Sequence, residues 1–140
     1  MIKLAIGEDH QSLIDGISLL LAAQEEIKLI CTANDGEDLV NQVLKYQPDV
    51  VITDIRMPKM DGIEATKLIK KQLPDTGIIA FSMFDQTEAI RQMLDAGASG
   101  YVLKNSSLET LKKAIKKVAS GETYFDSQID LSLIETDDFN

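Results

Sequence analysis

Short apolar runs recur roughly every 25 residues along this chain, and a segment with helical apolar spacing follows each of them. Continuous apolar runs of this length are typical of strands that a parallel sheet buries on both faces. The five runs are Ile2–Gly7, Ile27–Ala33, Val50–Thr53, Gly77–Phe81 and Gly100–Leu103. The pattern therefore predicts five successive βα units.

The segments between the runs have the apolar stripe of amphipathic helices that cover a sheet. Representative pairs are Ile14 and Ile17, Leu39 and Val43, Leu68 and Ile69, Ile90 and Met93, and Leu111 and Ile115. Asp61 is placed to cap the third helix, and Gly97 and Gly121 stand where left-handed helix ends are expected. Because βα crossovers are right-handed, we predict a doubly wound, flavodoxin-like α/β fold with strand order 2-1-3-4-5 and five helices.

A chain of 140 residues suffices for one domain, which we assign to residues 1–121. Residues 122–140 scatter apolar side chains among acids and hydroxyls and are predicted to be a linker or frayed tail. No apolar stretch approaches the ~20 residues of a membrane span, so we expect a cytoplasmic protein with no membrane contact. The net charge of −9 repels nucleic-acid phosphates, which argues against direct nucleic-acid binding by this segment.

Charged or hydroxyl residues directly follow four of the five runs: Glu8 and Asp9, then Asp54, then Ser82, then Lys104. The carboxyl ends of parallel strands meet at one edge of a sheet, so these side chains are expected to share a pocket. Carboxylate oxygens are hard ligands that favour Mg²⁺ over zinc. The set suits a divalent cation and a transferred phosphoryl group.

Charge repulsion supports this grouping. At ~5 Å and an effective dielectric near 20, each pair of like charges costs about 3 kcal/mol, which a cation and Lys104 would offset. Taken singly, the residues have simpler explanations: Asp9 could cap the first helix, and Ser82 could be an ordinary turn hydroxyl. It is their joint placement that predicts a site.

The motifs Glu8-Asp9, Asp54 with Met57-Pro58, Asp61-Gly62, Ser82 and the stretch Gly97 to Lys104 resemble the receiver domain of two-component response regulators, from Ile2 to about Ser120. The resemblance implies that Asp54 accepts a phosphoryl group from a sensor histidine kinase in a self-catalysed reaction, without the turnover of an enzyme. It implies that Mg²⁺ is held by Asp9, Asp54 and the backbone carbonyl of Arg56, with Glu8 reaching it through water. The implied roles of the remaining residues are phosphoryl contact for Lys104, switch hydroxyl for Ser82 and rotamer switch for Tyr101.

The loop from Ser82 to Asp85 and the stretch from Gly121 to Phe125 are similar to the subfamily in which a LuxR-type helix-turn-helix output domain follows the receiver. This implies regulation of transcription through an output domain that these residues do not include; a stand-alone receiver acting by protein–protein contact is the alternative. The family also leads us to expect a homodimer through the fourth helix, fifth strand and fifth helix.

Two features depart from or extend the family pattern. Many members have a cis proline after the lysine, whereas this chain has Asn105, which leaves the geometry of that loop open. Arg56 and Phe84 are expected to flank the site and hinder water, which would slow loss of the phosphoryl group.

Other functions conflict with particular residues. A flavodoxin-like cofactor module would need a hydroxyl- and glycine-rich loop where Gly7-Glu8-Asp9-His10 would repel a phosphate, so no organic cofactor is expected. A magnesium phosphohydrolase usually has an acid two residues after its aspartyl nucleophile, and Arg56 stands there. His10 is interpreted as an exposed first-turn residue in preference to a ligand. The lysines of the fifth helix, Lys112, Lys113, Lys116 and Lys117, are interpreted as a solvated face that suits the helix dipole.

Overall fold

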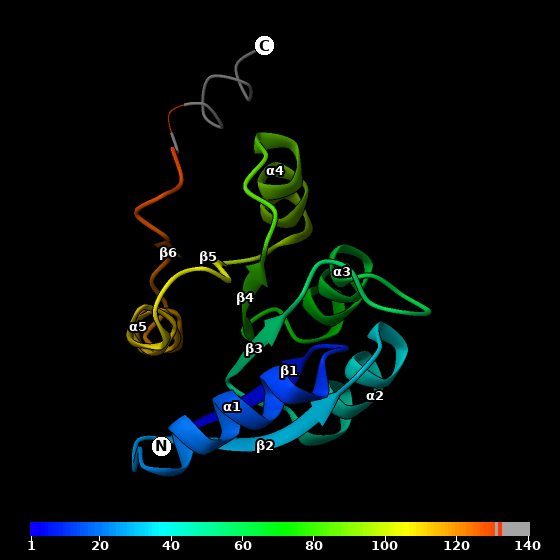
Figure 1. Ribbon diagram of the computed structural model, residues 1–140. Coiled ribbons are helices and arrows are strands. Elements are labelled where there is room, and N and C mark those ends of the chain that lie inside the picture. The colour runs from blue at the N-terminus through cyan, green and yellow to red at the C-terminus, as the bar shows by residue number, and fades with distance from the viewer. Residues whose placement is uncertain (131, 133–140) are drawn as a thin grey trace.

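The structure is a computed structural model that describes residues 1–130 and 132. Within these residues, six parallel strands form one sheet in the order β2-β1-β3-β4-β5-β6 (Figure 1). The strands are β1 (Ile2–Gly7), β2 (Ile27–Ala33), β3 (Val50–Thr53), β4 (Gly77–Ser82), β5 (Gly100–Leu103) and β6 (Tyr124–Phe125). The first five confirm the predicted order 2-1-3-4-5.

In the described part of the chain, five helices cover the sheet: α1 (Gln11–Ala22), α2 (Gly36–Tyr46), α3 (Gly62–Gln72), α4 (Thr87–Ala96) and α5 (Leu108–Ala119). The residues of α1 and α5 pack with those of β1, β3, β4 and β5 in one buried cluster. On the opposite face, α2 and α3 enclose a second cluster with β1 to β4, and α4 a third with β4 and β5. The doubly wound α/β fold with helices on both faces is therefore confirmed (Figure 1).

The helix ends follow the predicted chemistry. The Asp61 carboxylate accepts a hydrogen bond from the Glu64 N–H at the start of α3, and the Ser107 hydroxyl does the same for the Thr110 N–H at the start of α5. Gly97 ends α4 with φ of 112°, a left-handed conformation that glycine adopts without a side-chain clash. These local signals mark where α3 and α5 begin and where α4 ends.

The short strand β6 was not predicted, because the sequence analysis places its residues in the linker. It forms because the free edge of β5 offers carbonyl groups to the returning chain: the Tyr124 N–H donates to the Ser99 carbonyl at 3.0 Å, and the Asp126 N–H to the Tyr101 carbonyl at 2.9 Å. A two-residue strand has no apolar periodicity that sequence analysis could detect. The predicted tail residues 131 and 133–140 lie outside the described residues.

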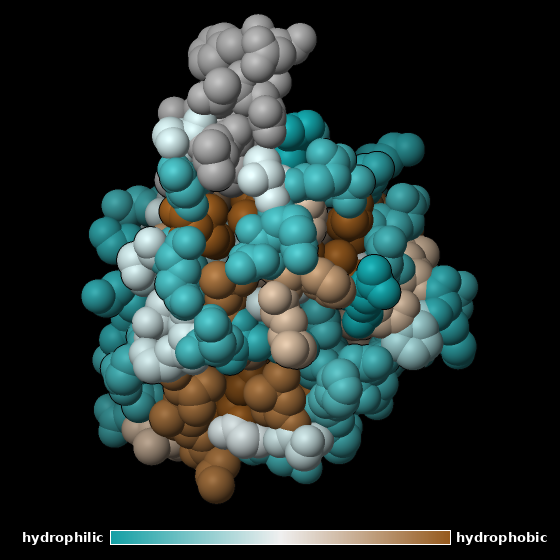
Figure 2. All heavy atoms as spheres, turned by 45° about the horizontal axis from the view of Figure 1, so that its top comes forward, coloured by the Kyte–Doolittle hydropathy of each residue, from teal (hydrophilic) through white to brown (hydrophobic). Residues whose placement is uncertain are grey.

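Large exposed hydrophobic side chains are few and spread over different elements, among them Leu19 on α1, Tyr46 on α2 and Met83 after β4. Most of the face shown in Figure 2 is hydrophilic, with hydrophobic residues visible in separate patches. In the part of the chain that the structure describes, no helix has the length and apolar character needed to span a bilayer.

Candidate functional site

Strand register brings the predicted site residues to one edge of the sheet. Gly7 of β1 pairs with Thr53 of β3, and the Asp54 N–H donates to the Gly7 carbonyl at 3.0 Å. Glu8 and Asp54 therefore follow directly after the ends of neighbouring strands. At the other pair of strands, the Lys104 N–H donates to the Ser82 carbonyl at 2.8 Å. The parallel sheet thus gathers residues that are far apart in the sequence.

Lys104 joins two carboxylates at the centre of this edge. Its Nζ lies 2.6 Å from Glu8 Oε1 and 2.7 Å from Asp54 Oδ2. All three side chains are largely buried, with Glu8 only 2% exposed. Burial by itself would lower the pKa of Lys104, but its hydrogen bonds to Asp54 and Glu8 outweigh burial and raise that pKa. Lys104 is therefore a fixed cation of the site.

The Asp54 carboxylate is held by a second contact. Its Oδ1 accepts the Ile55 N–H at 2.7 Å, while Oδ2 faces Lys104. The side chain keeps 9% of its surface exposed, so it reaches the surface at the rim of the sheet. The carboxylate is oriented from two sides before any ligand arrives.

Glu8 also belongs to an acidic group on the other side of the site. Carboxylate oxygens of Glu8 and Asp9 and a ring nitrogen of His10 lie within 4.8 Å of one another. His10 Nδ1 lies 3.0 Å from Glu8 Oε2 and 3.2 Å from Asp9 Oδ1, and these acids raise the pKa of the exposed imidazole. The N-cap residue of α1 is His10, so Asp9 does not cap the helix and its carboxylate remains available as a ligand.

This donor set fits Mg²⁺. Glu8 and Asp9 bring carboxylate oxygens close together beside His10, and Asp54 shares Lys104 with Glu8. These three carboxylates outnumber the ammonium of Lys104, and a divalent cation would offset their negative charge. Receiver domains in general bind Mg²⁺ at an acidic site of this kind.

Ser82 and Tyr101 are linked through the loop that follows β4. The Ser82 hydroxyl accepts the Phe84 N–H at 3.1 Å, and the Tyr101 hydroxyl donates to the Phe84 carbonyl at 2.6 Å. Both side chains are fully buried. Burial raises the pKa of Tyr101 to about 12, against the opposing influence of a hydrogen bond with Ser82. The phenol is therefore neutral and faces inward.

Arg56 and Phe84 lie against each other at the site. The guanidinium carbon of Arg56 is 4.9 Å from the centroid of the Phe84 ring, within the range of a cation–π contact. Arg56 is exposed and Phe84 is half-buried. The contact joins the loop after β3 to the loop after β4.

The turn after Lys104 contains no cis bond: among the described residues every peptide is trans, including that between Lys104 and Asn105. The Asn105 side-chain oxygen instead accepts a hydrogen bond from Gln128 Nε2 at 3.1 Å. An ordinary trans turn therefore presents Lys104 to the carboxylates.

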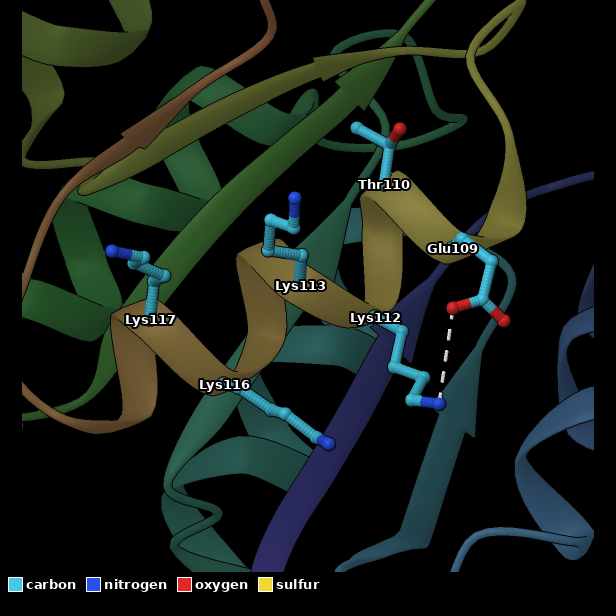
Figure 3. Close-up of a pocket in the computed structure, with 6 residues that line it drawn as sticks. All are labelled: Glu109, Thr110, Lys112, Lys113, Lys116 and Lys117. Carbon is cyan, nitrogen blue, oxygen red and sulfur yellow. Dashed lines mark ion pairs between the residues drawn. The ribbon is translucent and has the colours of Figure 1, made fainter.

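The lysine face of α5 lies apart from this site. Figure 3 shows Lys112, Lys113, Lys116 and Lys117 on the hollow that they line; Lys113 and Lys117 point in different directions, whereas Lys112 and Lys116 both extend towards the lower right. Lys116 pairs with Glu26 at 3.0 Å, and Lys112 and Lys117 lie 3.8 Å from Glu109 and Glu122. These contacts fit a solvated helix face.

Asp126, which was predicted to lie in the linker, contacts the Lys104 turn. The residue is 3% exposed and accepts hydrogen bonds from the turn that carries Lys104. Burial raises the pKa of an acid, yet bonds from Ser106, Gln128 and Leu103 outweigh it and lower the pKa of Asp126. An acid directly after the aromatic pair Tyr124-Phe125 is its only sequence signal.

Comparison with known proteins agrees with this geometry. The chain is 41% identical over 133 residues to the oxygen regulatory protein NreC of Staphylococcus epidermidis, covering 94% of this chain and 61% of that protein. It is 37% identical over 134 residues to the transcriptional regulatory protein DegU of Brevibacillus brevis, covering 96% and 57%. The chain thus spans less than two thirds of the length of these relatives.

Solved structures match over most of the chain as well. A LuxR-family two-component response regulator from Aurantimonas sp. SI85-9A1 superposes with a TM-score of 0.90 at 25% identity, covering 100% of this chain and 99% of that one. The receiver domain of RcsB from Salmonella enterica, solved with the phosphomimetic BeF3⁻, gives 0.83 at 28% identity, covering 91% and 95%. Because residues 4–116 also match the family described as the response regulator receiver domain, the chain belongs to that family.

Proposed function

We propose that this chain is a phosphorylation-dependent signalling switch in which Asp54 accepts a phosphoryl group from a sensor histidine kinase. The observation that carries the proposal is the pairing of one buried ammonium, Lys104, with Glu8 and Asp54 at the ends of parallel strands. Removing these charges from water costs free energy that their mutual attraction does not necessarily recover, so stability alone is a poor reason for this arrangement and a functional role explains it better. Family membership and the relatives named as regulators support the same function.

In the proposed transfer, an Asp54 carboxylate oxygen forms a bond to phosphorus as the P–N bond to the kinase histidine breaks. The imidazole leaves with the bonding electron pair, and the product is an acyl phosphate. Lys104 Nζ, 2.7 Å from Asp54 Oδ2, is placed to neutralise charge on the phosphoryl oxygens. The protein therefore contributes position and electrostatics, and the donor contributes the reactive bond.

Mg²⁺ would be held by Asp9, Asp54 and the Arg56 carbonyl, with Glu8 reaching it through water. When bound, the ion supplies positive charge for the phosphoryl oxygens. To contact the phosphoryl group, Lys104 has to give up at least one of its two ion pairs, with Glu8 or with Asp54. The other ion pair can then hold the ammonium at the site.

The switch runs through Ser82, Phe84 and Tyr101. A phosphoryl group on Asp54 offers a charged acceptor to the hydroxyl hydrogen of Ser82, and a movement of Ser82 towards it draws the hydroxyl oxygen away from the N–H of Phe84. A shift of the Phe84 backbone removes the carbonyl that the Tyr101 hydroxyl bonds to at 2.6 Å. Phosphorylation is thereby converted into a rearrangement of the loop after β4 and the surface around α4.

In this proposal residues 1–121 build the receiver domain, the stretch from Tyr124 to Ile129 packs on the edge of its sheet, and the chain leads on towards an output domain that regulates transcription in the cytoplasm. The relatives NreC and DegU are longer than the matched region and are named as regulatory proteins, which supports this division. RcsB has been solved as dimers bound to DNA. We therefore include a homodimer through α4, β5 and α5 in the proposal, with DNA contacts left to the output domain.

The direct test is mass spectrometry after incubation with Mg²⁺ and acetyl phosphate. The wild type and the Asp38→Asn control, which changes an exposed acid of α2, should each gain one phosphoryl group. Asp54→Asn, or removal of Mg²⁺ with a chelator, should abolish the gain. A protein that instead hydrolyses p-nitrophenyl phosphate through many turnovers would be a phosphohydrolase, and the proposal would be wrong.

A further inference from the structure

The chain that leaves α5 returns to the edge of the sheet and ends its pairing at the turn that carries Lys104. The β5–β6 ladder finishes with the bond from the Asp126 N–H to the Tyr101 carbonyl. One step further along β5, the Leu103 N–H donates at 3.1 Å to the Asp126 side chain, at Oδ2. The carboxylate thus takes the place that the next residue of a longer strand would fill.

The same carboxylate oxygen holds the far end of that turn. The Ser106 hydroxyl donates to Asp126 Oδ2, and the Ser106 N–H closes the turn by donating to the Leu103 carbonyl at 3.0 Å. Lys104 lies between these two anchored residues. Both ends of the turn from Leu103 to Ser106 are therefore tied to one buried side chain.

Gln128 holds the middle of the turn. Its side-chain Nε2 lies 3.1 Å from Asn105 Oδ1 and 2.9 Å from Ser106 Oγ. Its backbone N–H donates to Asp126 Oδ1 at 3.1 Å. Asn105 stands where many receivers have proline, so in this chain a hydrogen bond supplies the restraint that a proline ring would otherwise provide.

Apolar contacts fix the same segment to the switch region. Phe125 and Ile129, on either side of Asp126 and Gln128, pack on the buried cluster that contains Tyr101 and Leu103. The segment from Tyr124 to Ile129 is consequently bonded to the Lys104 turn and packed beside the switch tyrosine.

We propose that Asp126 is a positioning residue, which acts through the Leu103–Ser106 turn to set Lys104 against Asp54. The inference rests on the proposed function, since it assigns Lys104 a part in phosphoryl transfer. Lys104 approaches two carboxylates at 2.6 and 2.7 Å, and electrostatic stabilisation of this kind is lost when the turn shifts by a fraction of that distance. The segment from Tyr124 to Ile129 and the phosphorylation site are then coupled: a shift of the segment moves Lys104, and phosphorylation of Asp54 alters the turn that holds the segment.

The first test compares phosphorylation rates with Mg²⁺ and acetyl phosphate. Asp126→Ala should react about tenfold more slowly than wild type, and Asp126→Asn, which keeps an acceptor oxygen, within about threefold of it. The matched control is Asp130→Ala, since Asp130 is exposed and bonds to Ser132. Ser106→Ala provides a milder lesion of the same turn if Asp126→Ala does not fold.

The second test separates positioning from simple structural support. The dissociation constant for beryllofluoride, a phosphoryl mimic that is not transferred, is measured for Lys104→Ala with and without Asp126→Ala. In the wild-type background, Asp126→Ala should weaken beryllofluoride binding about tenfold. If Asp126 acts through Lys104, the same substitution in the Lys104→Ala background should change the dissociation constant less than about twofold. Equal weakening in both backgrounds, or a wild-type rate in Asp126→Ala, would overturn the inference. Failure of the wild type itself to gain a phosphoryl group would instead contradict the proposed function.

Discussion

The Arg56 guanidinium lies 4.9 Å from the Phe84 ring, and Phe84 in turn is bonded through its backbone to Ser82 and Tyr101. The two side chains therefore form a contacting pair that the Phe84 backbone joins to Ser82 and Tyr101. Both side chains were predicted to flank the site, and the structure adds their direct contact. An acyl phosphate on Asp54 would be shielded from water on this side.

Truncating Arg56 or Phe84 should shorten the lifetime of the acyl phosphate on Asp54. We expect Arg56→Asn and Phe84→Ala each to lose the phosphoryl group about three- to tenfold faster, because water gains access to the acyl phosphate. The measurement is the decay of phosphorylated protein after the donor is removed. Tyr46→Ala, which deletes the cation–π contact with Lys45 on α2, should leave the decay unchanged. Unchanged rates in both site variants would exclude shielding by these side chains.

The depressed pKa of Asp126 predicts how stability depends on pH. A folded-state pKa below the unfolded value of about 3.9 means that the carboxylate stabilises the fold above about pH 4, and that this contribution is lost as pH falls through the folded pKa. Urea unfolding should show wild type more stable than Asp126→Asn by about 1–2 kcal/mol at pH 7. The difference should shrink below about pH 4. A difference that stays constant down to pH 3, or that has the opposite sign, would contradict this assignment.

Helix α3 approaches the backbone of Asp54 so closely that its first residue has to be glycine. A Cβ at Gly62 would lie 2.0 Å from the Asp54 carbonyl oxygen, and the Gly62 N–H donates to the Ile55 carbonyl at 2.6 Å. Neither partner can move without displacing the end of β3. The start of α3 therefore helps to set the position of the phosphoacceptor.

This close approach gives a matched pair of substitutions. Gly62→Ala should destabilise the protein by roughly 1–3 kcal/mol and slow phosphorylation, because the end of β3 has to shift. Gly16→Ala on α1, where a Cβ would meet no atom within 4 Å, should stabilise it by about 0.5–1 kcal/mol and leave phosphorylation unchanged. Urea unfolding and the acetyl phosphate reaction measure both effects. Equal behaviour of the two variants would show that the contact at Gly62 is unimportant.

The elements differ in how well sequence could predict them. Strands β1, β3, β4 and β5 were identifiable because an apolar run that is almost wholly buried leaves a continuous signal, and their carboxyl ends then placed Glu8, Asp54, Ser82 and Lys104 together. The edge strand β2 is only partly buried, yet its apolar run was long enough to be recognised. Strand β6 was not identifiable, because it depends on the free edge of β5 and has only two residues. Asp126 was missed for the same reason: its role depends on backbone groups that only the folded chain brings near.

For the molecule as a whole, the excess negative charge at the site predicts a linkage between Mg²⁺ and folding. An ion that binds only the folded state stabilises it by about 1.4 kcal/mol at a tenfold excess over its dissociation constant. Thermal unfolding should show this gain for wild type and for Asp38→Asn, and its loss on addition of a chelator. Asp9→Asn should gain much less, because Asp9 is an exposed acid of the proposed ligand set. An equal gain for all three proteins would point to nonspecific ion effects.

The central claim is that the phosphoryl group resides on the carboxylate that Lys104 faces. Borohydride reduces an acyl phosphate of aspartate to homoserine, so peptide mass spectrometry after treatment of the phosphorylated protein identifies the acceptor. The account predicts homoserine at position 54 and unmodified aspartate at position 9. Phosphate found on His10, or homoserine at any position other than 54, would contradict it.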